Sequence, residues 1–154
     1  MSEIPSSLRT GIESIDAEHA QLLSFQQQLI AFCPFQTCEG SDCDESRRAD
    51  CNAAMTELFS DILIFMVDHF RHEERMMHGM ASGHVIGHRV AHEEISRRLS
   101  LLADRKVAAP LLATPAELQE VVGHWLRDHI REWDLPLATM IFESGRESAL
   151  AATT

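Results

Sequence analysis

The segment that decides the fold reads HFRHEE (69–74), HRVAHEE (88–94) and WLRDHIREWD (125–134), and a further histidine ends GIESIDAEH (11–19). In the first two of these blocks the polar side chains are four residues apart, so that each pair projects from one face of a helix. In the third block His129 and Asp134 are five residues apart, which suits a carboxylate that reaches back from the end of the helix. The same faces carry the apolar residues of each segment. Seven metal-competent residues share this placement: His19, His69, Glu73, His88, His92, His129 and Asp134.

Four segments show the three- and four-residue spacing of apolar side chains that is typical of amphipathic helices. The stripes run over 15–33, with Asp16 as the expected N-cap, over 55–73 and over 85–102. A fourth opens with a capping-box spacing at 114–117 and is expected to end near Asp134, before a tail that holds a short extra helix. We predict an all-α fold, an antiparallel up-down-up-down four-helix bundle with a short amino-terminal arm and a carboxy-terminal tail.

Composition is consistent with a single domain over residues 1–154. The chain is 45% hydrophobic, which is ordinary for a globular protein, and its net charge of −11 comes from 24 acidic against 13 basic residues. This charge argues against nucleic acid and anionic membranes as partners. The amino terminus has neither the basic start nor the apolar core of a signal peptide, and the longest apolar run is too short to cross a bilayer. We therefore expect a cytoplasmic protein.

The inward-facing polar residues indicate a metal centre. A lone histidine on an apolar stripe is usually a core residue with one hydrogen bond, but here such residues fall on all four helices. Burial of a carboxylate without a partner charge or hydrogen bonds costs roughly several kcal/mol, or the group takes up a proton and becomes neutral. Since a single zinc site uses about four ligands, seven residues fit two metals that share bridging carboxylates. The mixture of imidazole and carboxylate is compatible with iron.

The four blocks resemble the hemerythrin family, specifically the bacterial hemerythrins, with their order and most of their spacing intact. The resemblance implies two iron ions. His88, His92 and His129 would hold one iron, and His19 and His69 the other. Both would be bridged by Glu73, Asp134 and an oxo or hydroxo group. Dioxygen would bind end-on at the iron that has two histidines and rest there as hydroperoxide.

Four apolar side chains near the predicted ligands are expected to wall this oxygen pocket and to exclude water, although ordinary core packing explains them as well: Leu22, Phe70, Trp125 and Leu126. The leading hypothesis is therefore a binding protein, not an enzyme, that carries, stores or senses dioxygen. One alternative is a redox enzyme that acts on peroxide, nitric oxide or ferrous iron. Another is a signalling module that works through a separate small redox or signalling protein.

Some features depart from the family pattern. Leu8 stands where the family often has tryptophan, and Ser82 and Gly83 replace a usual Tyr-Pro. The first connection is long, and we predict a cysteine-containing insert at about 33–51. A redox-responsive disulfide is one hypothesis for its four cysteines, and a flexible insert with incidental thiols is the favoured one: Cys33, Cys38, Cys43 and Cys51. Of the remaining histidines, His72, His78 and His124 are expected at the surface, and so is His84, for which a role beside the ligands is the alternative.

Overall fold

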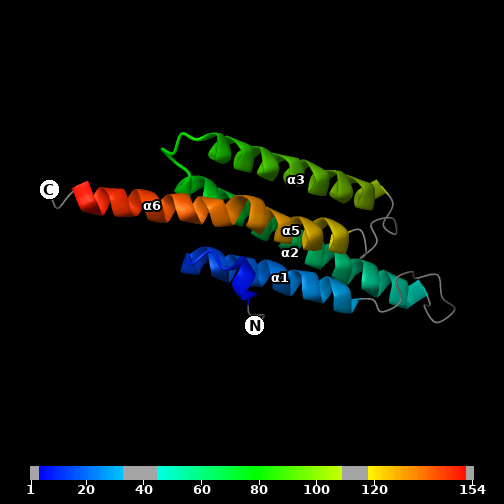
Figure 1. The fold of residues 1–154 in the computed structure, drawn as a ribbon. Helices are drawn as coiled ribbons and strands as arrows, with labels where there is room; N and C mark the ends of the chain where they lie inside the picture. Colours follow the sequence, from blue (N-terminus) through cyan, green and yellow to red (C-terminus); the bar gives the residue numbers. More distant parts are fainter. Residues whose placement is uncertain (1–3, 33–44, 109–117, 152–154) are drawn as a thin grey trace.

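The computed structural model describes residues 4–32, 45–108 and 118–151, and every regular element among them is helical, which confirms the all-α four-helix fold. A short 3-10 turn, η1 (Ser6–Leu8), precedes α1 (Glu13–Phe32), α2 (Glu45–Met76) and α3 (Gly83–Ala108). The fourth rod consists of η2 (Glu120–His124), α5 (Trp125–His129), η3 (Ile130–Asp134) and α6 (Leu135–Ala151). Figure 1 shows the four rods side by side, with the sequence colours running in alternate directions from one rod to the next.

The amino-terminal boundaries of the first two helices differ from the prediction. Helix α1 begins at Glu13, so Asp16 is not its N-cap. The Asp16 carboxylate instead accepts hydrogen bonds from the Thr10 amide and hydroxyl and from the Gly11 amide, which ties the arm to the first turn. Helix α2 begins at Glu45, well before the apolar stripe that marks it in the sequence. Residues 45–51 of the predicted insert therefore belong to this helix.

Three of the four cysteines in the predicted insert lie outside the described residues: Cys33, Cys38 and Cys43. Cys51 lies in α2, where only its helical backbone is described. Its place in a helix is nevertheless a correction to the prediction of an insert that reaches residue 51.

Two residues, Gly79 and Ser82, shape the turn between α2 and α3. Gly79 has φ +83°, a left-handed conformation that glycine adopts without the steric cost of a Cβ atom. The Ser82 hydroxyl then accepts a hydrogen bond from the Val85 amide, which caps the first turn of α3. These two residues let the chain reverse within a few positions, so that His69 and Glu73 near the end of α2 face the start of α3.

The fourth rod does not end near Asp134, as the sequence suggested, but continues into α6. Two of its segments, η2 and η3, are π-helical turns. At the end of η3 the Leu135 amide donates to the Ile130 carbonyl, a five-residue step. Pro136, which follows, has no amide hydrogen and would crowd the carbonyl four residues earlier in a regular helix. The wider turn accommodates the proline without breaking the rod.

The core consists of two apolar clusters with a polar layer between them. The larger cluster includes Leu22, Ile62, Leu99 and Leu126. The smaller one, Met77, Val85 and Leu137, lies toward the end of α2, the start of α3 and α6. Along α2, α3 and the fourth rod the predicted ligands fall between the two. Leu8, which replaces the frequent tryptophan of the family, belongs to the larger cluster.

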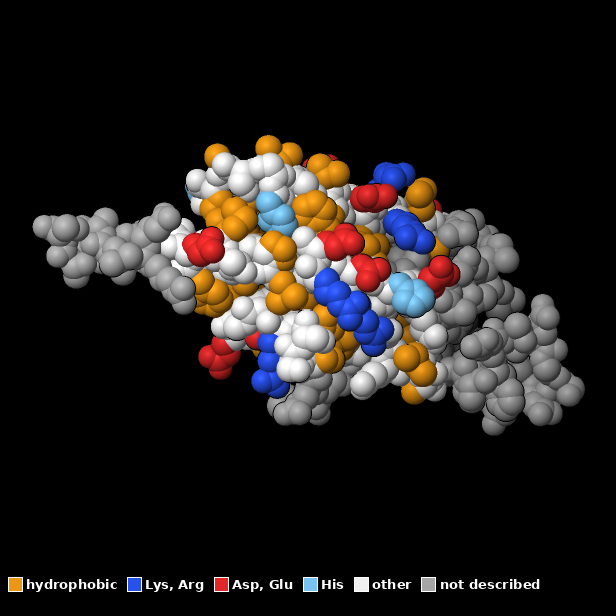
Figure 2. Space-filling view, viewed as in Figure 1, with side chains coloured by type: hydrophobic (Ala, Val, Ile, Leu, Met, Phe, Trp, Pro, Cys, Tyr) orange, Lys and Arg blue, Asp and Glu red, His pale blue; other side chains and the backbone are white. Residues whose placement is uncertain are grey.

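The surface has a mixed character on the face drawn in Figure 2. Acidic, basic and hydrophobic side chains are interspersed there over the described part of the molecule. No helix among the described residues is long and apolar enough to span a membrane.

Candidate metal centre

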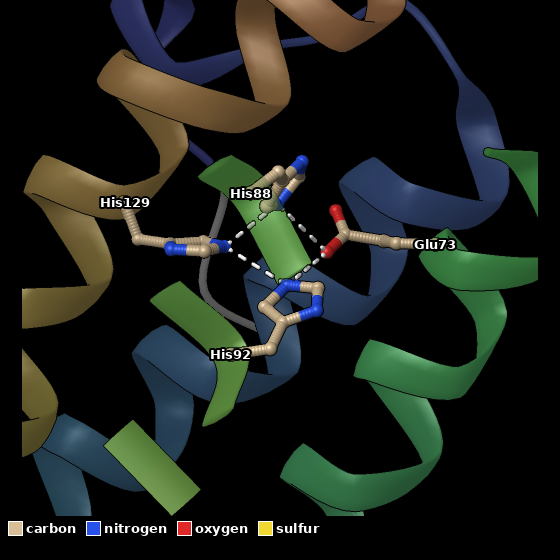
Figure 3. A group of neighbouring side chains, drawn as sticks. All are labelled: Glu73, His88, His92 and His129. Carbon is tan, nitrogen blue, oxygen red and sulfur yellow. Dashed lines mark hydrogen bonds and ion pairs between the residues drawn. The ribbon is translucent and has the colours of Figure 1, made fainter. Parts of the chain in front are cut away.

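The structure brings all seven predicted residues together in the polar layer of the core. Each of them is at most 3% exposed. Their side chains form two groups of potential ligand atoms that share Glu73: one with His88, His92 and His129, the other with His19, His69 and Asp134. Figure 3 shows the first group, in which Glu73 from α2, His88 and His92 from α3 and His129 from α5 point toward one another.

In the first group three imidazole nitrogens converge. The Nε2 atom of His129 lies 3.0 Å from Nε2 of His88 and 3.1 Å from Nε2 of His92. Metal–nitrogen bonds of about 2.0–2.1 Å place adjacent ligand nitrogens roughly 2.9–3.4 Å apart, for right-angle to tetrahedral arrangements. The observed separations match that range. This histidine group is therefore shaped for one small cation.

The two carboxylates connect this group to the second. Asp134 Oδ1 lies 3.0 Å from His88 Nε2 and 3.2 Å from His129 Nε2, and its other oxygen lies 3.0 Å from His19 Nε2. Glu73 Oε2 is 3.1 Å from His92 Nε2 and 3.7 Å from His69 Nε2. Each carboxylate thus faces imidazoles of both groups. All five histidines turn Nε2 toward the shared centre.

The hydrogen-bonding needs of these side chains are not met by the protein. Both oxygens of Glu73 and of Asp134, Nε2 of His69 and both ring nitrogens of His19 are buried without a hydrogen-bond partner among the described residues. Close contacts of acceptor atoms with poor geometry do not offset the loss of hydration. Two cations placed among these atoms would satisfy them, so the residues present fit a dinuclear metal site.

The protonation states favour ligation by the imidazoles. Burial lowers the pKa of His92 to about 2, with help from the neighbouring His129 and His88 rings. Burial also lowers the pKa values of His69 and His129, against the opposing effect of nearby carboxylates. These rings are therefore neutral at physiological pH, the form that binds metals.

The two carboxyl groups differ in the metal-free protein. Burial, followed by the repulsion of Asp134, raises the pKa of Glu73 well above its usual value. Burial alone would raise the pKa of Asp134 too, but the close approach of the His129, His19 and His88 imidazoles outweighs it and holds that pKa well below its usual value. The centre therefore keeps one carboxylate charged, and a bound cation would favour ionisation of both.

Sequence reasoning missed the carboxylates that orient the histidines from outside. Glu18 accepts from His69 Nδ1 at 2.8 Å and lies 2.7 Å from His72 Nδ1. These hydrogen bonds outweigh partial burial and lower the pKa of Glu18. Glu74 Oε1 lies 3.3 Å from His92 Nδ1. The available signal was the spacing of His69 and His72, which places both rings over one face of α2.

The predicted surface exposure of the other histidines is confirmed for two of them and wrong for two. His78 and His124 are exposed, as predicted. His72 is not at the surface as expected, because its contact with Glu18 leaves it half-buried. His84 is also half-buried, with Nε2 2.9 Å from the Trp133 carbonyl, which favours the alternative role beside the ligands.

Aromatic rings cover the three-histidine group. Phe70 stacks on His92 with ring centroids 4.1 Å apart, and Trp125 stacks on His129 at 4.3 Å. Trp133, which the sequence did not single out, stacks on His88 at 5.8 Å. Of the residues predicted to wall an oxygen pocket, Leu22, Phe70 and Leu126 lie in the larger apolar cluster and Trp125 packs against it.

Trp133 can approach α3 only because residue 87 is glycine. A Cβ atom at Gly87 would lie 2.6 Å from Cη2 and 2.7 Å from Cζ3 of Trp133. We expect Gly87→Ala to displace this ring from His88 and to lower the free energy of unfolding by about 1–3 kcal/mol, as overpacking does. Chemical denaturation followed by tryptophan fluorescence measures both effects.

Gly145 provides the matched control, because it lies within α6 and no atom would come within 4 Å of an added Cβ. Gly145→Ala should raise stability by about 0.5–1 kcal/mol through helix propensity alone. Equal effects of the two substitutions would contradict the close packing of Trp133 on residue 87.

Comparison with known proteins gives a consistent result. A model of the hemerythrin HHE cation-binding domain matches residues 10–141, a span that contains all seven clustered residues. The chain is similar to bacteriohemerythrin of Pseudomonas aeruginosa, from strains LESB58 and UCBPP-PA14. Each is 25% identical over 127 residues, which covers 82% of this chain and 72% of the relative. No solved structure gives a significant match.

Proposed function

Since the chain belongs to the hemerythrin HHE cation-binding family, we propose that it holds two iron ions in the polar layer of its core and binds dioxygen reversibly there. One observation carries the proposal. Five Nε2 atoms and two carboxylates converge from all four rods, and most of these buried atoms lack a hydrogen-bond partner. The proposed ligands are those of the sequence analysis: His88, His92 and His129 for one iron, His19 and His69 for the other, with Glu73 and Asp134 bridging.

The unequal division of histidines supports a binding function. One group offers three imidazoles and the other two, so the second leaves a place for a small ligand. Iron held by these residues would supply the electrons for a reversible reaction with dioxygen. An imidazole-rich ligand set donates less negative charge than a carboxylate-rich one, which favours the ferrous state and reversible binding. A solvent-derived bridge between the ions would complete the set proposed.

The protein around the centre controls water and orientation. Phe70 contacts His69, His92 and His129, with ring centroids 5.8, 4.1 and 6.2 Å apart, so it covers one side of both histidine groups. We propose that Leu22, Trp125 and Leu126 extend this apolar wall. Exclusion of water protects a charged, reactive ligand from proton transfer and slows the irreversible oxidation of the iron.

An anaerobic titration tests the proposal. The iron-loaded, reduced protein is exposed to dioxygen while visible absorption is recorded, and the gas is then removed. We expect absorption that appears with oxygen, saturates at one dioxygen per two irons and disappears on removal. Rapid irreversible oxidation, accompanied by turnover of peroxide or nitric oxide, would instead identify a redox enzyme and refute reversible binding.

Substitutions at Phe70 test the apolar wall. Phe70→Gln places an amide beside the histidines, whereas Phe70→Leu keeps the position apolar with a comparable loss of ring contacts. We expect the glutamine variant to oxidise in air at least about tenfold faster than the leucine variant, a difference of about 1.4 kcal/mol in barrier. Stopped-flow absorption of the reduced proteins measures the rates. Similar rates for the two variants would show that the wall is ordinary packing.

Glu18 tests the orientation of His69. Its carboxylate accepts the Nδ1 hydrogen of His69, and loss of such an outer hydrogen bond typically weakens metal affinity by about 10–100-fold. We expect Glu18→Ala to show a decrease in this range in competition with a chelator. Glu57, an exposed residue of α2, provides the control, and Glu57→Ala should leave affinity unchanged. An unchanged affinity in Glu18→Ala would remove Glu18 from the site.

A further inference from the structure

A groove between the end of α2 and the start of α3 concentrates positive charge on an acidic chain. It has a volume of about 680 Å³ and is lined by Arg71, Glu74, Arg75, His78 and Arg89. The whole chain has 13 basic against 24 acidic residues. Three arginines and one carboxylate therefore give the groove a net positive charge, whereas the chain as a whole has a net negative charge.

The arginines of this groove are poorly paired. Arg71 lies 3.6 Å from Asp68, but both side chains are about two-thirds exposed, and such a pair holds its partners weakly. Within the described ranges 4–32, 45–108 and 118–151, no carboxylate lies at ion-pair distance from Arg75 or Arg89. Their exposed guanidinium groups are available to a ligand.

The one carboxylate in the lining is engaged elsewhere. Glu74 directs Oε1 toward His92 Nδ1, at 3.3 Å. Among the described residues it forms no ion pair with the arginines that line the groove. The groove keeps a net positive charge, whatever the protonation of His78, because three guanidinium groups stay charged at all physiological pH values.

We propose that this groove binds a small, multivalent phosphate-bearing anion. Guanidinium groups present planar, forked donors that match phosphate oxygens, and arginine is the residue that most often recognises them. The groove is open to solvent and its lining is charged, so it suits a small anion held at the surface. This inference does not depend on the proposed reaction with dioxygen, since none of the three arginines is a proposed metal ligand.

Isothermal titration calorimetry with pyrophosphate tests the site in the protein as purified, at low ionic strength. We expect saturable binding of one pyrophosphate per chain, and Arg75→Gln and Arg89→Gln should each weaken it about tenfold, the usual effect of losing one charged hydrogen bond. Arg97, also exposed on α3 but outside the groove, provides the control. Arg97→Gln should change the affinity less than twofold.

The outcomes separate this site from other sources of binding. Absence of saturable binding, or binding that Arg75→Gln and Arg89→Gln leave unchanged, overturns the proposal, since the anion would then bind elsewhere, for example at a metal. Equal weakening by Arg97→Gln would reduce the effect to general charge and would also overturn it. A rise in affinity as salt is lowered, lost in the groove variants, supports the site.

Discussion

Glu73→Leu is expected to reduce the iron content of the protein from two ions per chain to one or fewer. Among the described residues, the glutamate alone belongs to both groups of ligand atoms, with Oε2 3.1 Å from His92 Nε2 and 3.7 Å from His69 Nε2. Leucine has a similar volume and no donor atom, so both metal positions lose a ligand together. Elemental analysis of freshly purified protein measures the change.

The same substitution should stabilise the metal-free protein against unfolding. Burial raises the pKa of Glu73, and neither carboxylate oxygen has a hydrogen-bond partner, so the residue destabilises the fold when no cation is present. Replacing such a group by an apolar side chain is often stabilising by about 1–4 kcal/mol. We expect Glu73→Leu to be more stable than the metal-free wild type in urea.

Glu57→Leu is the matched control for this pair of measurements, because Glu57 is exposed on the same helix. Glu57→Leu should leave the iron content at two ions per chain. It should change the free energy of unfolding of the metal-free protein by no more than about 0.5 kcal/mol. A Glu73→Leu protein that keeps two irons, or that is less stable than the wild type without metal, would refute the view that this carboxylate is retained for a cation.

Removal of the metal should have the second large effect, a decrease in melting temperature of about 10 °C. Ligands present at about 1,000 times their dissociation constant stabilise a protein by roughly 4 kcal/mol. For a chain of this size about 1 kcal/mol corresponds to about 2–4 °C. Differential scanning calorimetry before and after treatment with a chelator measures the shift.

The chelator experiment has an internal check. In Glu73→Leu the same treatment should change the melting temperature less than in the wild type, because at most one iron per chain remains to be removed. If the wild type melts at the same temperature with and without chelator, although iron has been lost, the polar layer does not depend on cations for its stability. Such a result would contradict the argument from the unpartnered buried atoms.

The sequence by itself determined the four helical rods and the seven polar residues that face inward. The spacing of His69 and Glu73, or of His88 and His92, depends only on the local period of a regular α-helix. Four such segments with polar residues on their apolar faces suffice to predict a bundle around a metal centre. Burial of all seven residues agrees with this prediction.

Tertiary structure decided which groups meet across the bundle. Glu18 reaches His69 and His72 over 51 and 54 positions of sequence, and this contact depends on the rotation and register of α1 against α2. The five-residue step from His129 to Asp134 led to the prediction that the helix ends near Asp134, which is wrong. A π-helical turn brings both side chains to the centre and lets the rod continue past Pro136. Helical periodicity is a local property and can therefore be predicted from the sequence. Packing angles and widened turns depend on how the four rods pack against one another in the folded protein.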